Sequence, residues 1–552
     1  MVTGAESTAR HAKRRTAGKK SGLARSSVMM AGATVVSRAT GLIRQVLQGA
    51  ALGNGLLAST YNTANTLPTS LYILLIGGAL NAVLVPQLVR ARAAHSDGGR
   101  AYEQRLVTLV LTVLAAGTAL AVWAAPQIVG LYMRDTPDGH QAFRLTVVFA
   151  RFLLPQIFFY GLFSMLGQVL NAREKFGAMT WTPVLNNFVL IGMFSAYLGL
   201  LTVPHSVADI TAAQVRWLGI GTTVGIAAQA LALIPFARAA GFRFRPRFDW
   251  RGTGLGSGVH AAKWTLLFVL ANQVALAVVT NFATAADREL PKAGVGYTSY
   301  SYAQAIWTLP QSVVTVSLVT ALLPRMSKAA AEGRIGDLRA DLSRALRISG
   351  VVIVPAAFLF AALGTQIAAL LFAHGAADPA SVEPLGYMLQ AFGLGLIPFS
   401  AQYLLLRGFY AFEDTRTPFF MAVWIGVVNI ALAAVCHALL PARWAVTGMA
   451  GAYTLSYLAG LALTARLLAR RTGGRLDDGT LRGTYAKLLG AGAAAAAVGW
   501  AVARGCAAVL GGSGTAVTAL TTIAGALALA MTYLVLGRLL RVTELRRIPG
   551  LR

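Results

Sequence analysis

The chain has 552 residues, of which 56% are hydrophobic and 12% charged, whereas soluble domains carry about 25% charged residues. The cores of soluble domains cannot hide so large an apolar fraction, so the composition excludes a soluble protein and predicts a membrane protein. The 48 Lys and Arg against 20 Asp and Glu give a formal net charge of +28. Two cysteines, Cys436 and Cys506, lie in apolar stretches and offer neither a disulfide framework nor a cysteine metal site.

The N-terminus is polar and basic. Residues 1–25 contain seven Lys or Arg and predict a disordered cytoplasmic tail. We do not expect a cleavable signal peptide, because the apolar segment that follows is long, contains arginines and lacks a clear small-residue cleavage site.

Long apolar segments follow the tail. A helix that crosses a bilayer needs about 20 mostly apolar residues, because only a helix satisfies its own backbone in hydrocarbon. Fourteen segments meet this requirement, namely 27–50, 66–89, 105–125, 145–170, 182–201, 216–237, 262–283, 297–323, 346–372, 386–406, 418–440, 446–465, 486–503 and 515–537. The expected fold class is therefore an all-α polytopic membrane protein with about 14 transmembrane helices.

Basic residues are distributed unequally between the two sides of these spans. If successive loops take alternate sides, the side of the N-terminal tail carries 38 Lys or Arg and the other side carries five. Those five are Arg134, Arg288, Lys292, Arg443 and Arg504. This pattern predicts that both termini are cytoplasmic. Because topology explains the charge excess, we expect no nucleic-acid partner.

An internal repeat divides the chain. Thr66-Leu67-Pro68-Thr69-Ser70 recurs as Thr308-Leu309-Pro310-Gln311-Ser312, and Val85-Pro86 corresponds to Leu323-Pro324. The offset spans six helices, which predicts two six-helix lobes in parallel pseudo-twofold repeat around a central cavity. The expected units are an N-terminal lobe over 26–240, a C-terminal lobe over 241–475, and helices 13 and 14 with a cytoplasmic tail over 476–552. Pro68, Pro86, Pro310 and Pro324 mark bends, or the ordinary punctuation of membrane helices.

Charged groups inside the predicted spans are cationic. Every acidic residue falls in a predicted loop, tail or span edge, which argues against a proton antiporter driven by an intramembrane carboxylate. Arg38 and Arg44 lie in the first span and Arg151 in the fourth. A buried arginine requires a watery cavity or a partner, and with no acid available an anion such as pyrophosphate fits. The alternative, snorkelling to the interface, is favoured for Arg151.

Neutral polar residues gather around the second span and before Pro310. We expect these to contact substrate, with interhelical hydrogen bonding as the alternative for each one. The set comprises Ser59, Asn62, Asn65, Tyr72 and Gln304. Gly53 and Gly55 form a hinge or simply a turn. The sequence has no metal-ligand spacing of histidines and no phosphate-binding G-x-x-x-x-G-K-[ST] loop.

The run Ser37-Arg38-Ala39-Thr40-Gly41-Leu42-Ile43-Arg44 is the most specific motif of the chain. Together with Gly53-Asn54-Gly55, Leu67-Pro68, Val85-Pro86 and Leu323-Pro324-Arg325-Met326-Ser327, it resembles the MurJ (MviN) lipid II flippases of the multidrug/oligosaccharidyl-lipid/polysaccharide exporter superfamily. This resemblance covers nearly the whole chain. It implies a transporter, not an enzyme, that moves undecaprenyl-pyrophosphate-linked disaccharide-pentapeptide across the bacterial cytoplasmic membrane by alternating access, for cell-wall synthesis.

The same resemblance implies first-span cavity arginines at Arg38 and Arg44, and a lipid tail guided by spans 13 and 14. It implies membrane lipids and cell-wall synthesis proteins as partners, no cofactor, and energy from the membrane potential or a monovalent ion. The chain departs from the family at Ser59, Tyr72, Gly77 and Gln304-Ala305, so two of four expected cavity arginines are replaced. An exporter of another lipid-linked glycan or amphipathic anion, or a non-transporting scaffold of wall synthesis, remains an alternative.

Overall fold

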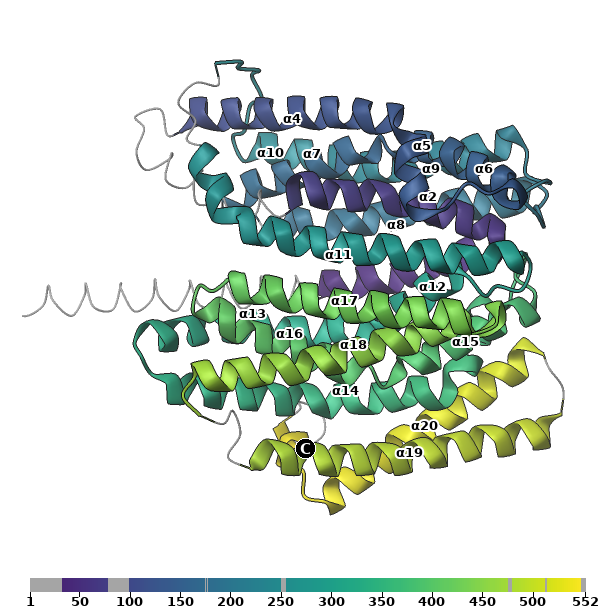
Figure 1. Ribbon diagram of the computed structural model, residues 1–552, viewed down its shortest axis with the longest axis vertical. Helices are drawn as coiled ribbons and strands as arrows, with labels where there is room; N and C mark the ends of the chain where they lie inside the picture. The colour runs from purple at the N-terminus through teal and green to yellow at the C-terminus, as the bar shows by residue number, and fades with distance from the viewer. Residues whose placement is uncertain are drawn as a thin grey trace, which may run out of the picture.

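Helices, without any strand, make up the secondary structure of the part of the chain that the computed structural model describes. That part comprises residues 32–77, 99–173, 175, 177–249, 255–474, 479–511 and 514–547. Most helices run roughly along one common direction (Figure 1), and some consecutive helices, such as α9 (Ala212–Leu231) and α10 (Leu233–Ala239), continue one another within a single span. The predicted all-α fold class is confirmed, whereas the predicted tail over 1–25 and Pro86 lie outside the described residues.

Apart from its first helix, which lies below α11 (Leu255–Glu289) in Figure 1 and packs on the second lobe, the first lobe forms the upper half of the molecule in that view. It begins with a helix over 32–52. The following elements are α2 (Leu56–Tyr72), the π-helix η1 (Ile73–Gly77), α4 (Arg100–Trp123), α5 (Ala125–Tyr132), the 3-10 helix η3 (Pro137–Gly139), α6 (His140–Leu153), α7 (Gln156–Asn171), α8 (Gly177–Leu200), α9 (Ala212–Leu231) and α10 (Leu233–Ala239). Their core contains Tyr61, whose ring meets Phe149 edge-on at 5.4 Å and Phe194 at 6.4 Å.

The second lobe lies below the first in Figure 1. Its elements are α11 (Leu255–Glu289), α12 (Tyr297–Trp307), α13 (Leu309–Ala331), α14 (Ile335–Phe372), α15 (Pro379–Gly393), α16 (Leu396–Ala411), α17 (Arg416–Leu439) and α18 (Ala442–Arg471). Helix α11 lies between the lobes, because it packs along α17 and also contacts α2 and α5. Buried Trp307 anchors the core against Phe392 at 5.4 Å and Phe399 at 4.8 Å.

The chain ends in α19 (Thr480–Leu510), α20 (Thr515–Leu539) and the 3-10 helix η4 (Thr543–Arg547). Helices α19 and α20 pack on each other and on α14. Small residues allow this contact, since a Cβ on Gly499 would stand 2.7 Å from the Gly525 carbonyl oxygen and one on Gly492 would meet Phe358. The predicted boundaries at 240 and 475 stay predictions.

Ten of the described helices are long and apolar enough to cross a membrane, or eleven if the pair α15 and α16, bent by 49°, forms one span. The multi-pass prediction is confirmed, but the count of fourteen is not. The predicted spans 27–50 and 66–89 extend into residues outside the described ranges. The predicted span 297–323 corresponds to α12 and α13, which are interrupted at Thr308.

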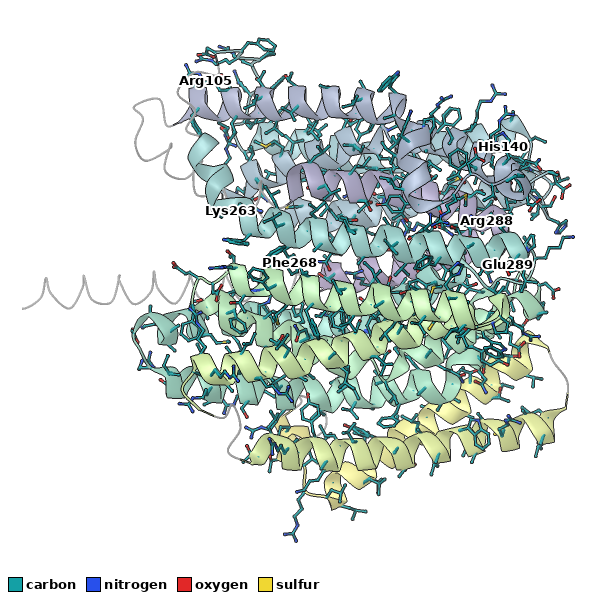
Figure 2. All side chains as sticks on the ribbon, in the orientation of Figure 1. Arg105, His140, Lys263, Phe268, Arg288 and Glu289 are labelled. Carbon is teal, nitrogen blue, oxygen red and sulfur yellow. The ribbon has the colours of Figure 1, made fainter. Side chains whose placement is uncertain are left out.

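The two ends of the bundle differ in charge. Figure 2 shows Arg105 and Lys263 at the end where α4 and α11 begin, and His140, Arg288 and Glu289 at the other. We call the first the basic end and the second the opposite end. The described parts of the predicted basic-rich loops, such as those before α8 and before α14, lie at the basic end, in keeping with the sequence pattern.

Candidate substrate cavity

A cavity of about 530 Å³ lies between the two lobes, in the half of the bundle toward the basic end. It is lined by Thr34, Ser37, Arg38, Gly41, Leu42, Arg44 and Gln45 of the first helix, Thr180, Pro183 and Asn187 of α8, and Ala305, Thr308 and Leu309 at the junction of α12 and α13. Arg38 and Arg44 are the only charged residues in this lining set. The cavity is therefore cationic and suited to an anionic ligand.

Arg44 is half-buried, and its buried Nε has no hydrogen-bond partner within the described part of the chain. An unpaired buried donor is unfavourable, more so on a charged group. This geometry favours the cavity alternative over snorkelling for Arg44. Arg38 is more exposed and also lines the cavity, whereas Arg151 is exposed in the last turn of α6 and lies outside the lining set.

Asn187 holds the arginine-bearing helix in place. Its Nδ2 donates to the Ser37 carbonyl oxygen at 2.9 Å and to Thr40 Oγ1 at 3.0 Å. These bonds fix the helical turn that contains Arg38 against α8. Sequence reasoning missed Asn187, although an amide within the apolar span 182–201 was a signal that could have found it.

Two predicted substrate residues instead join the lobes through buried hydrogen bonds. Asn62 accepts from Gln48 Nε2 at 2.7 Å and donates to Thr298 Oγ1 of the second lobe at 3.0 Å. Ser59 Oγ accepts from the Thr298 backbone N–H at 3.1 Å. In this conformation Ser59 and Asn62 thus show the interhelical alternative, and a contact with substrate stays a prediction.

The other predicted residues lie outside the lining set as well. The Tyr72 ring stacks on Tyr160 with 5.7 Å between centroids, and Asn65 and Gln304 are half-buried. Ala305 does line the cavity. The position at which the resemblance predicts a second-lobe arginine thus faces the cavity but supplies no charge.

Main-chain contacts between the lobes close the opposite end. The Ala376 N–H donates to the Ala50 carbonyl oxygen at 2.8 Å, and the Leu56 N–H donates to the Pro291 carbonyl oxygen at 2.9 Å. We call this contact, formed by residues 50–56 with Pro291 and residues 375–376, the seam. The lobes therefore touch beyond the cavity at the opposite end, while the cavity lies toward the basic end.

Two glycines allow this close approach. Gly53 has φ +70, which favours glycine, and a Cβ there would stand 3.2 Å from the Ala376 carbonyl oxygen. Gly55 has an ordinary φ of −85, but a Cβ there would overlap the Pro291 carbonyl oxygen. The predicted glycine pair thus forms a turn that meets the second lobe.

The predicted prolines differ between the lobes. Pro68 lies inside α2, whose π-helical continuation begins five residues later at Ile73. Pro310 lies in the first turn of α13, directly after the interruption at Thr308, and Pro324 lies inside α13. The repeated motif therefore has different local geometry in each lobe, and a hinge role for these prolines stays a prediction.

Known proteins share the sequence pattern of this chain. Residues 49–535 match the family model described as lipid II flippase MurJ. A protein of Rhizobium meliloti named probable lipid II flippase MurJ is 30% identical over 413 residues, which cover 73% of each chain. A Burkholderia cenocepacia protein named lipid II flippase MurJ is 26% identical over 413 residues, which cover 74% of this chain and 77% of the relative.

Solved structures share the fold. A lipid II flippase MurJ in an inward closed conformation superposes with a TM-score of 0.72 at 18% identity, covering 93% of this chain and 99% of the other. An inward-facing multidrug resistance transporter of the MATE family gives a TM-score of 0.61 at 14% identity, covering 78% and 95%. The two-lobed transporter fold is therefore common to these proteins.

Proposed function

The chain belongs to the lipid II flippase MurJ family, and we propose that it moves lipid II across the bacterial cytoplasmic membrane for peptidoglycan synthesis. The substrate is then undecaprenyl-pyrophosphate-linked disaccharide-pentapeptide. In this proposal both termini and the basic end face the cytoplasm, because Lys and Arg are retained on that side. The chain acts as a transporter without a cofactor.

One observation supports this proposal above the others: the unpartnered buried Nε of Arg44 in a cavity whose lining set contains no acid. A pyrophosphate offers the charge and the acceptor oxygens that a guanidinium fork fits. Arg38 and Arg44 are six residues apart on one helix, about 9 Å along its axis. Because both residues line the same cavity, they offer two guanidinium groups to one bound anion.

Alternating access follows from the arrangement of cavity and seam. Substrate enters between the lobes from the cytoplasm while the seam is closed. Release on the other side requires the seam contacts and the bond between Ser59 and Thr298 to break. The membrane potential contributes about 2.3 kcal/mol per elementary charge per 100 mV, and two cavity arginines carry such charge. Coupling to a monovalent ion is the other source of energy.

Complementation of a conditional flippase-depleted bacterium tests this function. We expect the parent chain to restore growth and outward-exposed lipid II. Arg44→Ala should abolish the rescue, and Arg44→Lys should restore it only in part, because it keeps the charge without the planar fork. Arg38→Ala should weaken it. Arg151→Ala, an exposed arginine outside the cavity, is the matched control, and membrane expression is measured for each variant.

A second candidate function is export of another lipid-linked glycan or amphipathic anion. It is favoured by Ala305 in the cavity wall and Tyr72, which stand where the resemblance predicts arginines. Two results together would support it: a well-expressed parent chain fails to expose lipid II, and another lipid-linked anion competes for the binding site. A scaffold of wall synthesis would instead tolerate Arg38→Ala and Arg44→Ala without a phenotype.

A further inference from the structure

The connection between the lobes carries an alternating pattern of aromatic and basic residues. After Gly241 the chain reads Phe-Arg-Phe-Arg-Pro-Arg-Phe-Asp over residues 242–249. These residues are non-helical and lie beside the first turns of α4, at the basic end (Figure 1). We call them the Phe-Arg segment. In an extended chain such alternation places the aromatic and the basic side chains on opposite faces.

A buried ion pair anchors the start of the segment. Arg173 binds Glu103 through two hydrogen bonds of 2.8 Å each, and both side chains are largely buried. The Arg173 guanidinium carbon also lies 5.6 Å from the ring centroid of Phe242, which is only 5% exposed. Phe242 is thus held against the first lobe by packing and by a cation–π contact.

Further bonds to α4 fix the backbone of the segment. The Arg243 carbonyl oxygen accepts from Gln104 Nε2 at 3.2 Å, and the Arg247 N–H donates to Thr108 Oγ1 at 3.0 Å. Asp249 forms an ion pair with Arg105. The segment is therefore tied along α4, while the side chains of Arg243, Phe244 and Arg245 stay exposed.

An apolar pocket of about 610 Å³ lies between the segment and the lobe. Its walls are apolar side chains of α4, α7 and α10, among them Val107, Leu166 and Ile234. Two exposed arginines, Arg238 and Arg243, belong to the same lining. An apolar interior next to two guanidinium groups matches a molecule with an acyl chain and an anionic headgroup.

We propose that this pocket binds one anionic phospholipid of the surrounding bilayer, with an acyl chain in the pocket and the phosphate at Arg238 and Arg243. The occupant comes from the bilayer because α4, and the continuous segments that contain α7 and α10, are candidate membrane spans. In this proposal Phe244, which lines the pocket and is 46% exposed, lies where headgroups meet acyl chains. This lipid is distinct from the transported substrate, since none of these residues lines the central cavity.

The location gives this lipid a defined effect. The Phe-Arg segment follows α10 at the end of the first lobe, and the chain then continues to α11. A lipid bound in the pocket holds the Phe-Arg segment at the membrane surface, against the first lobe. Binding should therefore stabilise the anchored conformation of the Phe-Arg segment, by a free energy that rises with the logarithm of the anionic-lipid concentration once the site is mostly filled.

Lipid retention by the purified full-length chain tests the proposal. The chain is equilibrated in detergent with phosphatidylglycerol or with phosphatidylcholine, and retained lipid is counted by native mass spectrometry. We expect one retained phosphatidylglycerol and little phosphatidylcholine. Arg243→Ala should weaken phosphatidylglycerol binding about fivefold, as expected for one basic residue at an anionic surface, and Arg243→Lys should keep most of it.

Matched variants separate binding from folding. Arg470→Ala removes an exposed arginine from the last turn of α18, at the same end but outside the pocket, and should leave retention unchanged. If Arg243→Ala lowers the melting temperature of the lipid-free chain, Arg238→Ala on the same rim replaces it. Equal retention of both lipids, or unchanged retention in the rim variants, would overturn the proposal. Displacement of phosphatidylglycerol by inorganic phosphate would also overturn it, by indicating a free-phosphate site.

Discussion

Gly55 offers a direct test of the seam, because its substitution separates steric contact from backbone strain. With φ −85 the residue adopts a conformation open to alanine, so Gly55→Ala introduces no backbone penalty. The added methyl group overlaps the Pro291 carbonyl oxygen, so the lobes must move apart there. That movement stretches the 2.9 Å bond from the Leu56 N–H, and overpacking of this kind costs about 1–3 kcal/mol. The closed seam should therefore lose about 5- to 150-fold in population relative to an open one.

Distance measurements between spin labels test this shift. Labels at Ala208→Cys and Ala380→Cys, exposed positions of the two lobes at the opposite end, report the separation after Cys436 and Cys506 are replaced by serine. Gly55→Ala should increase the long-distance population. Gly514→Ala is the matched control, since it also precedes a helix at this end but has nothing within 4 Å of its added Cβ. Identical distance distributions in both variants would refute the assignment of the seam as a gate.

Three further predictions concern stability. Glu103→Gln should destabilise the chain by about 3–5 kcal/mol, because it leaves the buried charge of Arg173 without its partner. Arg105→Gln, at the exposed pair with Asp249, should cost no more than about 1 kcal/mol. Equal melting temperatures of these two variants would contradict this expectation. Thr298→Val should lower stability by about 1–3 kcal/mol, because Asn62 Nδ2 loses its buried acceptor, the Thr298 hydroxyl, while Ser59 keeps its bond from the Thr298 main-chain N–H. A thermal unfolding curve that matches the parent would exclude a role for the bond between Asn62 and Thr298. Burial alone would raise the pKa of Asp414, but hydrogen bonds from Thr417 and the charge of Arg471 lower it below its usual 3.8 overall. The stabilisation that the ionised Asp414 carboxylate gives the folded chain should be present above pH 3.8 and lost as the pH falls through the lowered pKa. Asp414→Asn should therefore be less stable than the parent at neutral pH and should lose less stability in acid.

Hydropathy predicted where most membrane helices lie, but not where they end. The seventh span was expected to end at 283, whereas α11 continues to Glu289 and contains the buried Asp287. The Asp287 carboxylate accepts from the Tyr297 N–H at 3.1 Å, which compensates part of the penalty for burying a charged residue. Such a bond depends on a neighbouring helix, and the hydropathy of the segment itself contains no sign of it.

The candidate site was predictable where residues are unusual for their surroundings. Arginine in an apolar span needs an explanation, and Arg38 and Arg44 do line the cavity. Ser59 and Asn62 were less predictable, because a hydroxyl or amide in a span serves a ligand or another helix equally well. Only the position of Thr298 on the second lobe distinguishes the two.

The seam and the cavity are built from different groups, and this difference affects how sequence changes can alter transport. The hydrogen bonds of the seam join main-chain groups, whereas side chains of the first helix, α8 and the junction of α12 and α13 surround the cavity. Amino-acid changes in the cavity can therefore alter which headgroup is accepted, while the main-chain hydrogen bonds of the seam at the opposite end stay the same. Substrate selectivity and gating can therefore change independently, and a substitution in the cavity wall, such as the one that places Ala305 there, can alter the accepted cargo without altering the seam.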